Sequence, residues 1–196
     1  VVPESLPPER RRAVRAGRIA RDFQDLGRNR RFFLSALLLT SSFGVITAWL
    51  AASSFVLQGY FGLSPTAYSL SFAMIFFGYL LAGYLNTLLL RRFAPESILH
   101  ASVYALVVSV AILVLFLAVD HLPLWLLLLL VTASSSTIAP LAANATAVGI
   151  GAVASNRAGT ASATMGAMET LIPAALIPIL GAFEASPAPL VIAFAI

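Results

Sequence analysis

Long apolar stretches alternate with short polar or turn-forming ones from residue 32 onward. Residues 32–90 contain no charged side chain, and this stretch is too long for one membrane-spanning helix of about 20 residues. Gly59, Gly62 and Pro65 interrupt it, as turn-forming residues do. Further breaks fall at residues 91–96, 120–123 and 149–157. The pattern predicts five full spans, at about 32–57, 67–90, 97–119, 123–148 and 158–183, and a partial span from 190 that is cut short.

The composition supports this prediction and excludes several classes of protein. Hydrophobic residues make up 60% of the 196 residues and charged residues 10%, whereas soluble domains carry about 25% charged residues. The chain has no cysteine, and His100 and His121 are isolated in the sequence, so we expect no metal site. No nucleophile–base pattern or phosphate-binding loop is visible. We therefore expect no catalytic residues, no enzyme activity and no cofactor.

All 12 basic residues are arginines, and they are distributed very unevenly. Residues 1–31 hold nine of them against four acids, and residues 32–196 hold three against four acids. With five spans, the N-terminus and the breaks at 91–96 and 149–157 share one side, which then receives every arginine. The positive-inside rule places that side in the cytoplasm. The high isoelectric point thus belongs to one short segment, and we expect no nucleic-acid partner.

The basic segment, residues 1–31, is predicted to be a cytoplasmic linker containing an amphipathic helix. Ala16, Ile19, Phe23 and Leu26 recur at three- and four-residue spacing, with arginines on the other faces. Such a helix can lie on the membrane surface with its arginines toward anionic headgroups. A solvated linker helix is the alternative.

A stripe containing four polar residues follows one face of the first predicted span. The stripe comprises Thr40, Phe43, Thr47, Ala51, Ser54 and Gln58. Polar groups inside a membrane usually face protein or water, so the stripe predicts the lining of an aqueous cavity. Contact with another helix is the alternative, because Ser and Thr often bond within such helices. The opposite face, which includes Trp49, is apolar and is expected to meet lipid or a neighbouring helix.

The fourth predicted span carries Ser134, Thr137, Leu141 and Asn144 on one face, with Pro140 expected to kink the helix. We consider Thr137 and Asn144 candidates for the substrate cavity. For Asn144, a hydrogen bond between helices is an equally open alternative.

Glu169 lies near the centre of the fifth predicted span, far from either end. A charged residue at a helix centre is costly to insert in a membrane, which makes Glu169 a candidate for proton coupling and for attracting cationic substrates. A buried structural glutamate is the alternative. Small residues every four positions, Gly159, Ala163 and Ala167, and a second set at Gly78, Ala82 and Gly83, predict close helix packing.

Several segments taken together resemble the C-terminal half of major facilitator superfamily transporters. They are PESLPPERRR, LGRNRRFF, LQGYFGLSPTAYSLSF, GYLNTLLLRRF, PLAANATAVGI and RAGTASATMGA, in this order along nearly the whole chain. More narrowly, they resemble the drug:proton antiporters of the bicyclomycin-resistance type (Bcr/CflA type).

The resemblance implies an all-α membrane protein: the C-terminal six-helix half of a 12-helix fold, with the last helix truncated. It further implies a partner N-terminal six-helix half, alternating access and a bacterial inner-membrane location. GYLNTLLLRRF would then match a loop motif of the superfamily, which makes Gly83, Arg91 and Arg92 candidates for a cytoplasmic gate, although the motif's acidic residue is missing. Relatives often carry an uncharged residue in place of Glu169.

The function implied by the resemblance is proton-driven export of small, amphipathic, drug-like compounds. The candidate cavity residues are Phe43, Thr47, Ser54, Gln58, Thr137, Asn144 and Glu169. A metabolite or sugar exporter of the same fold is one alternative. A non-transporting structural membrane protein is another, and it predicts that the polar stripes face partner helices.

Overall fold

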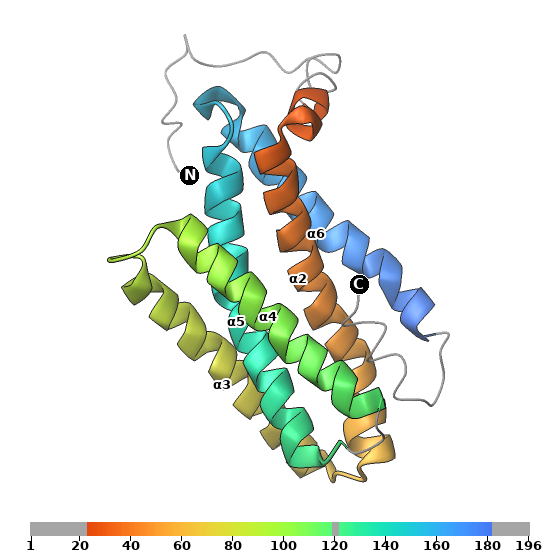
Figure 1. Cartoon of the computed structure of the whole chain (residues 1–196). Coiled ribbons are helices and arrows are strands. Elements are labelled where there is room, and N and C mark those ends of the chain that lie inside the picture. Colours follow the sequence, from red (N-terminus) through yellow and green to blue (C-terminus); the bar gives the residue numbers. More distant parts are fainter. Residues whose placement is uncertain (1–22, 119–121, 182–196) are drawn as a thin grey trace, which may run out of the picture.

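The computed structural model describes residues 23–118 and 122–181, which are almost entirely helical and contain no strand (Figure 1). Residues 23–28 form a short helix that precedes five long ones. The long helices are α2 (Arg30–Ser54), α3 (Pro65–Leu89), α4 (Pro95–Ala118), α5 (Leu124–Gly151) and α6 (Ala158–Gly181). Two short elements complete them, the π-helical turn η2 (Phe55–Tyr60) and the 3-10 turn η3 (Ser155–Arg157). The all-α prediction is confirmed for these residues.

The helices begin where local capping chemistry allows them to. The Asn29 side chain accepts a hydrogen bond from the backbone N–H of Phe32 at the start of α2, and Ser64 does the same for Ala67 at the start of α3. Pro65 follows as the first residue of α3, a position that needs no backbone donor. Side-chain caps of this kind satisfy N–H groups that have no partner within the helix.

The break between the first two spans is shorter than the sequence suggests. We expected it to begin near residue 58, but the helix continues through Gly59 as η2 and ends at Tyr60. The chain turns at Gly62, whose φ of 68° is a backbone conformation that glycine adopts without strain. A glycine within a helix weakens it without ending it, so Gly59 alone did not mark the boundary.

Four helices in the described residues are long and apolar enough to cross a membrane. They are Arg30–Tyr60, Pro65–Leu89, Pro95–Phe116 and Leu124–Gly151, which correspond to the first four predicted spans. Several helices of this kind are typical of a membrane-embedded protein. Helix α6 forms where the fifth span was predicted, and its crossing of a membrane stays a prediction. Most of the basic segment and the partial span from 190 lie outside the described residues.

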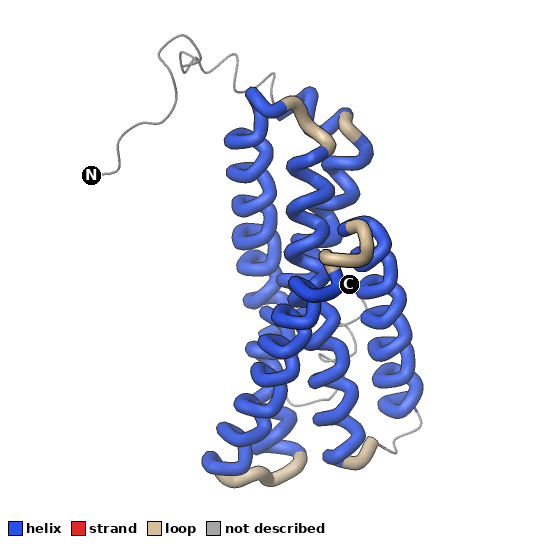
Figure 2. The backbone as a smooth tube through the Cα atoms, turned by 90° about the vertical axis from the view of Figure 1, so that its left-hand side faces the viewer, coloured by secondary structure: helices blue, strands red, loops and turns tan. Residues whose placement is uncertain are grey.

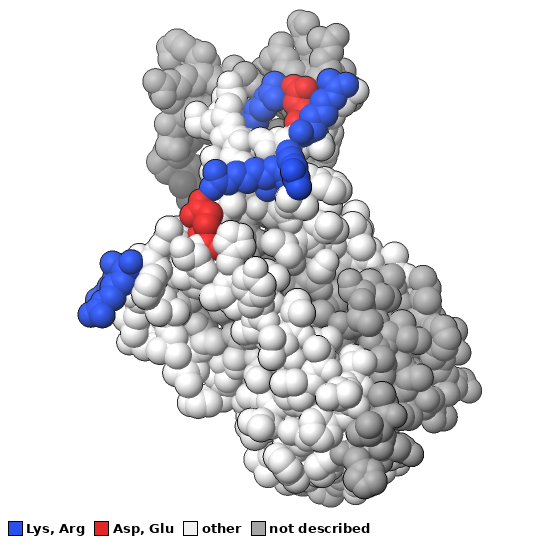
Figure 3. Space-filling model, viewed as in Figure 1, with Lys and Arg blue, Asp and Glu red and all other residues white. Residues whose placement is uncertain are grey.

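Helix α5 is the centre of the bundle. It packs against α2, α3, α4 and α6, while α6 also packs along α2. Helices α2 and α5 run roughly along the long axis of the molecule, and α3, α4 and α6 are inclined to it in Figure 1; Figure 2 shows the bundle from the side. The start of α2, the end of α5 and the start of α6 meet at one end, which we call the arginine end (Figure 1). The arginines visible in Figure 3 gather toward it, as the predicted topology requires.

Two apolar clusters fill the interior. One contains Trp49, Ile75 and Ile138, from α2, α3 and α5. The other contains Leu26, Phe32 and Met165 and lies nearer the arginine end. The apolar face of the first span therefore meets neighbouring helices rather than lipid at Trp49, which is only 4% exposed.

Small residues bring α3 close to α5, as predicted. A Cβ atom at Gly78 would lie 2.8 Å from the Ser136 Oγ and 2.8 Å from the Thr132 Cγ2, which is closer than van der Waals contact. The corresponding prediction for α6 is wrong within the described residues, because Gly159, Ala163 and Ala167 are exposed. Helix α6 is turned so that Ala161 and Met165 form its buried face.

Candidate functional site

The polar stripe of α2 changes character along the helix. Thr40 is buried, and its hydroxyl donates to the Ala36 carbonyl at 2.8 Å. Phe43 packs against the apolar cluster nearer the arginine end, and Thr47 is half-buried. At the far end, the Gln58 amide donates to the exposed Ser54 hydroxyl at 3.0 Å. The stripe thus leaves polar surface available from Thr47 onward, while Thr40 is satisfied by its own helix.

Asn144 makes a hydrogen bond between helices. It is 1% exposed, and its amide nitrogen donates to the Asn86 Oδ1 at 2.8 Å and to the Pro140 carbonyl at 2.7 Å. Of the two interpretations that the sequence allowed for Asn144, the structure shows the interhelical one. Its partner Asn86 on α3 was not among the predicted residues, although it is the only Asn in the span 67–90, which has no charged residue.

Ser134 makes a second buried polar contact on the same helix. Its hydroxyl lies 2.9 Å from the Ser109 hydroxyl of α4. Thr137, a predicted cavity residue, is half-buried and donates to the Ser134 carbonyl at 2.7 Å. The predicted polar face of α5 therefore holds α3 and α4 against the central helix.

Glu169 differs from the other two carboxylates in the described part of the chain. Asp25 pairs with Arg157 at 2.9 Å, and Glu96 pairs with Arg31, in both cases at the arginine end. Glu169 is half-buried on α6, and among the described residues it has neither a hydrogen bond nor an ion pair. It is not joined by a hydrogen bond to the polar groups of α2 or α5 in these regions. Glu169 is therefore the described carboxylate left available for a ligand or a proton.

The three gate candidates lie along the end of α3 and the turn that follows it. A Cβ at Gly83 would lie 3.7 Å from the Ala139 Cβ, an ordinary contact with α5. Arg91 and Arg92 are exposed in the turn before α4. The structure thus places Gly83 in a helix contact and the two arginines at the surface, and their role as a gate stays a prediction.

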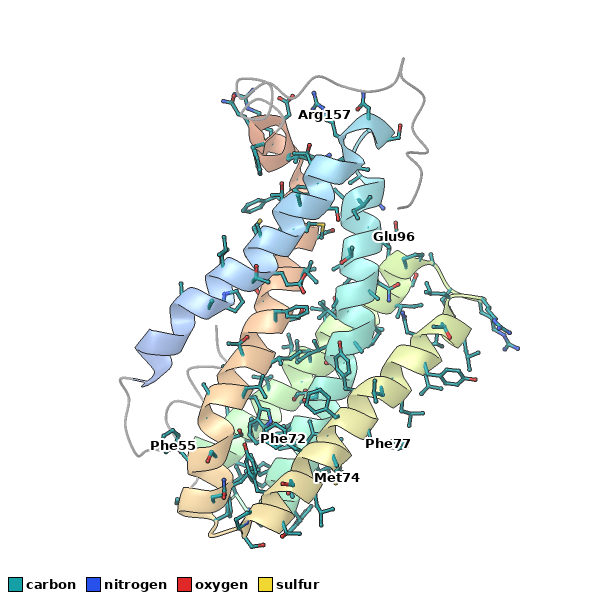
Figure 4. The ribbon with its side chains drawn as sticks, turned by 180° about the vertical axis from the view of Figure 1, so that it is seen from behind. Phe55, Phe72, Met74, Phe77, Glu96 and Arg157 are labelled. Atoms are coloured by element: carbon teal, nitrogen blue, oxygen red, sulfur yellow. The ribbon has the colours of Figure 1, made fainter. Side chains whose placement is uncertain are left out.

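The arginine end is stabilised by contacts of the segment before α2 with the end of α5 and the start of α6. The Asn29 amide donates to the Ala152 carbonyl at 2.8 Å, just after α5. Asp25 pairs with Arg157 of η3, just before α6, and Leu26 is 2% exposed within the apolar cluster. Figure 4 labels Arg157 at this end of the bundle. The end of the basic segment is therefore packed onto the bundle. Of the predicted apolar face, Leu26 is thus buried against other helices of the chain, whereas Phe23 is 47% exposed.

Replacing Asn29 by alanine is expected to lower the free energy of unfolding by about 1.5–2.5 kcal/mol. The variant loses the helix cap, worth about 1 kcal/mol, and the bond to the Ala152 carbonyl, worth about 0.5–1.5 kcal/mol. Ser64→Ala is the matched control, because Ser64 only caps α3. Denaturant titration of the purified protein measures both variants, and equal losses would contradict a role for the contact with Ala152.

A pocket lies between α2, α3 and α5, at the level of the Trp49 cluster. Its volume is about 150 Å³, and its lining residues are Val45, Ile46, Trp49, Leu50, Ile75, Phe76, Tyr79, Ser135 and Ile138. The indole N–H of Trp49 is buried and has no hydrogen-bond partner in the described regions. The sequence did not predict this pocket, because it depends on how three helices from distant parts of the chain pack together.

No protein-family model matches the chain, and no curated protein matches it. In residues 23–118 and 122–181 no three or more His, Asp or Glu side chains gather as they would around a metal ion. Glu169 and the polar groups inside the apolar helices are therefore the features of the described residues that indicate a function.

Proposed function

We propose that this chain forms the C-terminal half of a proton-coupled efflux transporter that works by alternating access. The proposed fold is that of the major facilitator superfamily, of the bicyclomycin-resistance type, in a bacterial inner membrane. The partner half, which supplies the first six helices, would enclose the cavity together with this one. The substrates would be small amphipathic compounds exported in exchange for protons, with the N-terminal segment in the cytoplasm.

The observation that supports this proposal is that the Glu169 carboxylate has no hydrogen bond or ion pair with any described residue. Two of the three described carboxylates are neutralised by arginines at the arginine end, whereas Glu169 lies on α6 with no partner in the described residues. An ionisable residue within an apolar helix bundle is costly and usually marks a substrate or proton pathway. The gathering of arginines at one end supports the assigned orientation.

Replacing Glu169 by glutamine is expected to reduce pH-gradient-driven efflux by about tenfold or more, because glutamine cannot take up or release a proton. Efflux of a panel of amphipathic cations and neutral compounds is measured with the full-length protein in inverted vesicles. Glu96→Gln is the control: Glu96 is already paired with Arg31 at the exposed end, and exposed ion pairs contribute little to stability. We expect this control to retain coupled efflux.

Three outcomes would argue against the proposal in different ways. Full coupling in Glu169→Gln would remove Glu169 from the proton pathway. Flux of hydrophilic metabolites or sugars, with none of the amphipathic panel, would indicate the alternative exporter. No flux of any compound by a folded protein would indicate a non-transporting structural protein.

A further inference from the structure

We propose that the turn between α3 and α4 binds the phosphate of an anionic phospholipid through Arg91 and Arg92. The acyl chains of this lipid would lie along the exposed side of α4. The inference rests on the proposed membrane embedding, with the arginine end at the cytoplasmic leaflet, and needs neither a transported substrate nor a proton. It is carried by the juxtaposition of two arginines without a counter-charge and a helix face that changes from polar to apolar.

Arg91 and Arg92 have no ion pair within the described residues. Both side chains are exposed in the turn that follows α3. The nearest carboxylate along the chain, Glu96, pairs with Arg31 of α2. Two adjacent positive charges are therefore available for a counter-charge that the described part of the chain does not supply.

The turn lies at the edge of the molecule rather than among the other charges. Figure 1 shows it to one side of the bundle, apart from the start of α2 and the end of α5. In the same view, Figure 3 shows the basic side chains at this edge separated from the acidic ones and from the remaining basic ones. Arg91 and Arg92 are the only basic residues of the turn. Their guanidinium groups are therefore exposed to the surroundings of the bundle.

The exposed side of α4 becomes apolar with distance from the turn. Exposed polar residues come first, then a tyrosine, then aliphatic residues: Ser97, His100, Tyr104, Val107, Val108 and Leu115. Helix α4 is also the most apolar of the four helices that are long enough to cross a membrane, and it packs chiefly against α5. This order of side chains matches the headgroup region, the interface and the hydrocarbon core of a bilayer. The side of α4 that follows the turn therefore suits a lipid.

Two exposed tyrosines mark the depth of the turn. Tyr104 is 72% exposed and lies about 14 Å along α4 from its start, at 1.5 Å per residue. Tyr84 is 62% exposed and lies about 8 Å before the end of α3. Tyrosine is enriched at the membrane–water interface. Arg91 and Arg92 lie beyond both tyrosines, at the end where arginine side chains extend toward the headgroups.

An anionic phosphate suits the two arginines better than a zwitterionic headgroup does. Guanidinium groups donate paired hydrogen bonds to phosphate oxygens, and an anionic surface attracts each arginine near it. A zwitterionic lipid adds a cation beside its phosphate. Glu96, the carboxylate nearest in the sequence, is already paired with Arg31 and is not free to hold that cation.

The unfolding temperature of the full-length protein in neutral detergent tests the proposal. Dioleoylphosphatidylglycerol is titrated into the micelles, and dioleoylphosphatidylcholine has the same acyl chains with a zwitterionic headgroup. We expect a saturable rise with the first lipid and a smaller rise without saturation with the second. In Arg91→Gln/Arg92→Gln the apparent affinity for dioleoylphosphatidylglycerol is expected to fall about tenfold to thirtyfold. If the double variant does not fold, each single variant should lose about fivefold.

Two controls separate a site from general attraction. Arg28→Gln/Arg30→Gln removes the same charge from exposed positions before and at the start of α2, and it should weaken binding by less than about threefold. Glycerol 1-phosphate carries the phosphate without acyl chains, and it should produce no saturable rise at equal concentration.

The possible results separate this inference from the transport proposal. Equal weakening in the two double variants, or equal saturable rises with the two lipids, would overturn the site. A loss of stability in Arg91→Gln/Arg92→Gln that is the same with and without lipid would indicate an acidic residue of the partner half instead. Intact lipid binding by a protein without coupled efflux would contradict the transport function alone. Coupled efflux without a preference for the anionic lipid would contradict this inference alone.

Discussion

Replacing Gly78 by alanine is expected to force α3 away from α5 and lower the free energy of unfolding by about 1–3 kcal/mol. The added methyl group would lie 2.8 Å from atoms of both Ser136 and Thr132. Neither side chain is free to move aside, because the Ser136 hydroxyl donates to the Thr132 carbonyl and the Thr132 hydroxyl to the Leu128 carbonyl. The clash of the added methyl group can be relieved only by breaking one of these hydrogen bonds or by separating α3 from α5.

Gly83→Ala on the same helix is the matched control, and we expect it to change stability in the opposite direction. Its methyl group would make an ordinary 3.7 Å contact with Ala139, so only the higher helix propensity of alanine acts, worth up to about 1 kcal/mol. Unfolding in increasing denaturant, followed by circular dichroism, measures both variants. A stabilised Gly78→Ala variant would show that α3 and α5 are farther apart than described.

Replacing Asn144 by leucine is expected to destabilise the protein by about 1–3 kcal/mol, because Asn86 then keeps a buried amide with no partner. Asn86 is 4% exposed, so water cannot readily replace the lost bond. A smaller loss is expected for Asn86→Leu, because the Asn144 amide nitrogen then keeps its bond to the Pro140 carbonyl. These losses are large for one polar contact, since measured hydrogen bonds between membrane helices average about 0.6 kcal/mol.

The double variant Asn86→Leu/Asn144→Leu completes a thermodynamic cycle. It should be less destabilised than the sum of the single variants, because neither amide is then buried alone. Additive losses, with no coupling between the two positions, would contradict a direct contact between α3 and α5 at this depth.

The arrangement of helices along the chain was largely predictable because hydrophobicity reports directly on spanning segments. Each of the five full predicted spans contains one long helix, and the ends differ by only a few residues. The predicted helix ends are wrong where a residue type can occur both inside a helix and in a turn. Gly59 reads as a break but remains helical, whereas Gly62 takes the left-handed backbone conformation and makes the turn.

The candidate site was less predictable, because periodicity gives the face of a helix but not its neighbour. The spacing of Ser134 and Asn144 predicted one polar face, and both residues are buried. Whether that face met water or another helix depended on Ser109 and Asn86, which lie on other helices. The rotation of α6, which exposes Gly159 and buries Met165, likewise depends on packing that one helix does not encode.

The central position of α5 has a mechanical consequence. A helix that contacts four others couples their displacements, because sliding any one of them past it must disturb contacts such as Asn86–Asn144 or Ser109–Ser134. The five helices are thus expected to move together as one rigid body rather than to slide past one another. In a transporter of the proposed kind, the hinge would then lie between this unit and its partner half, and not within it.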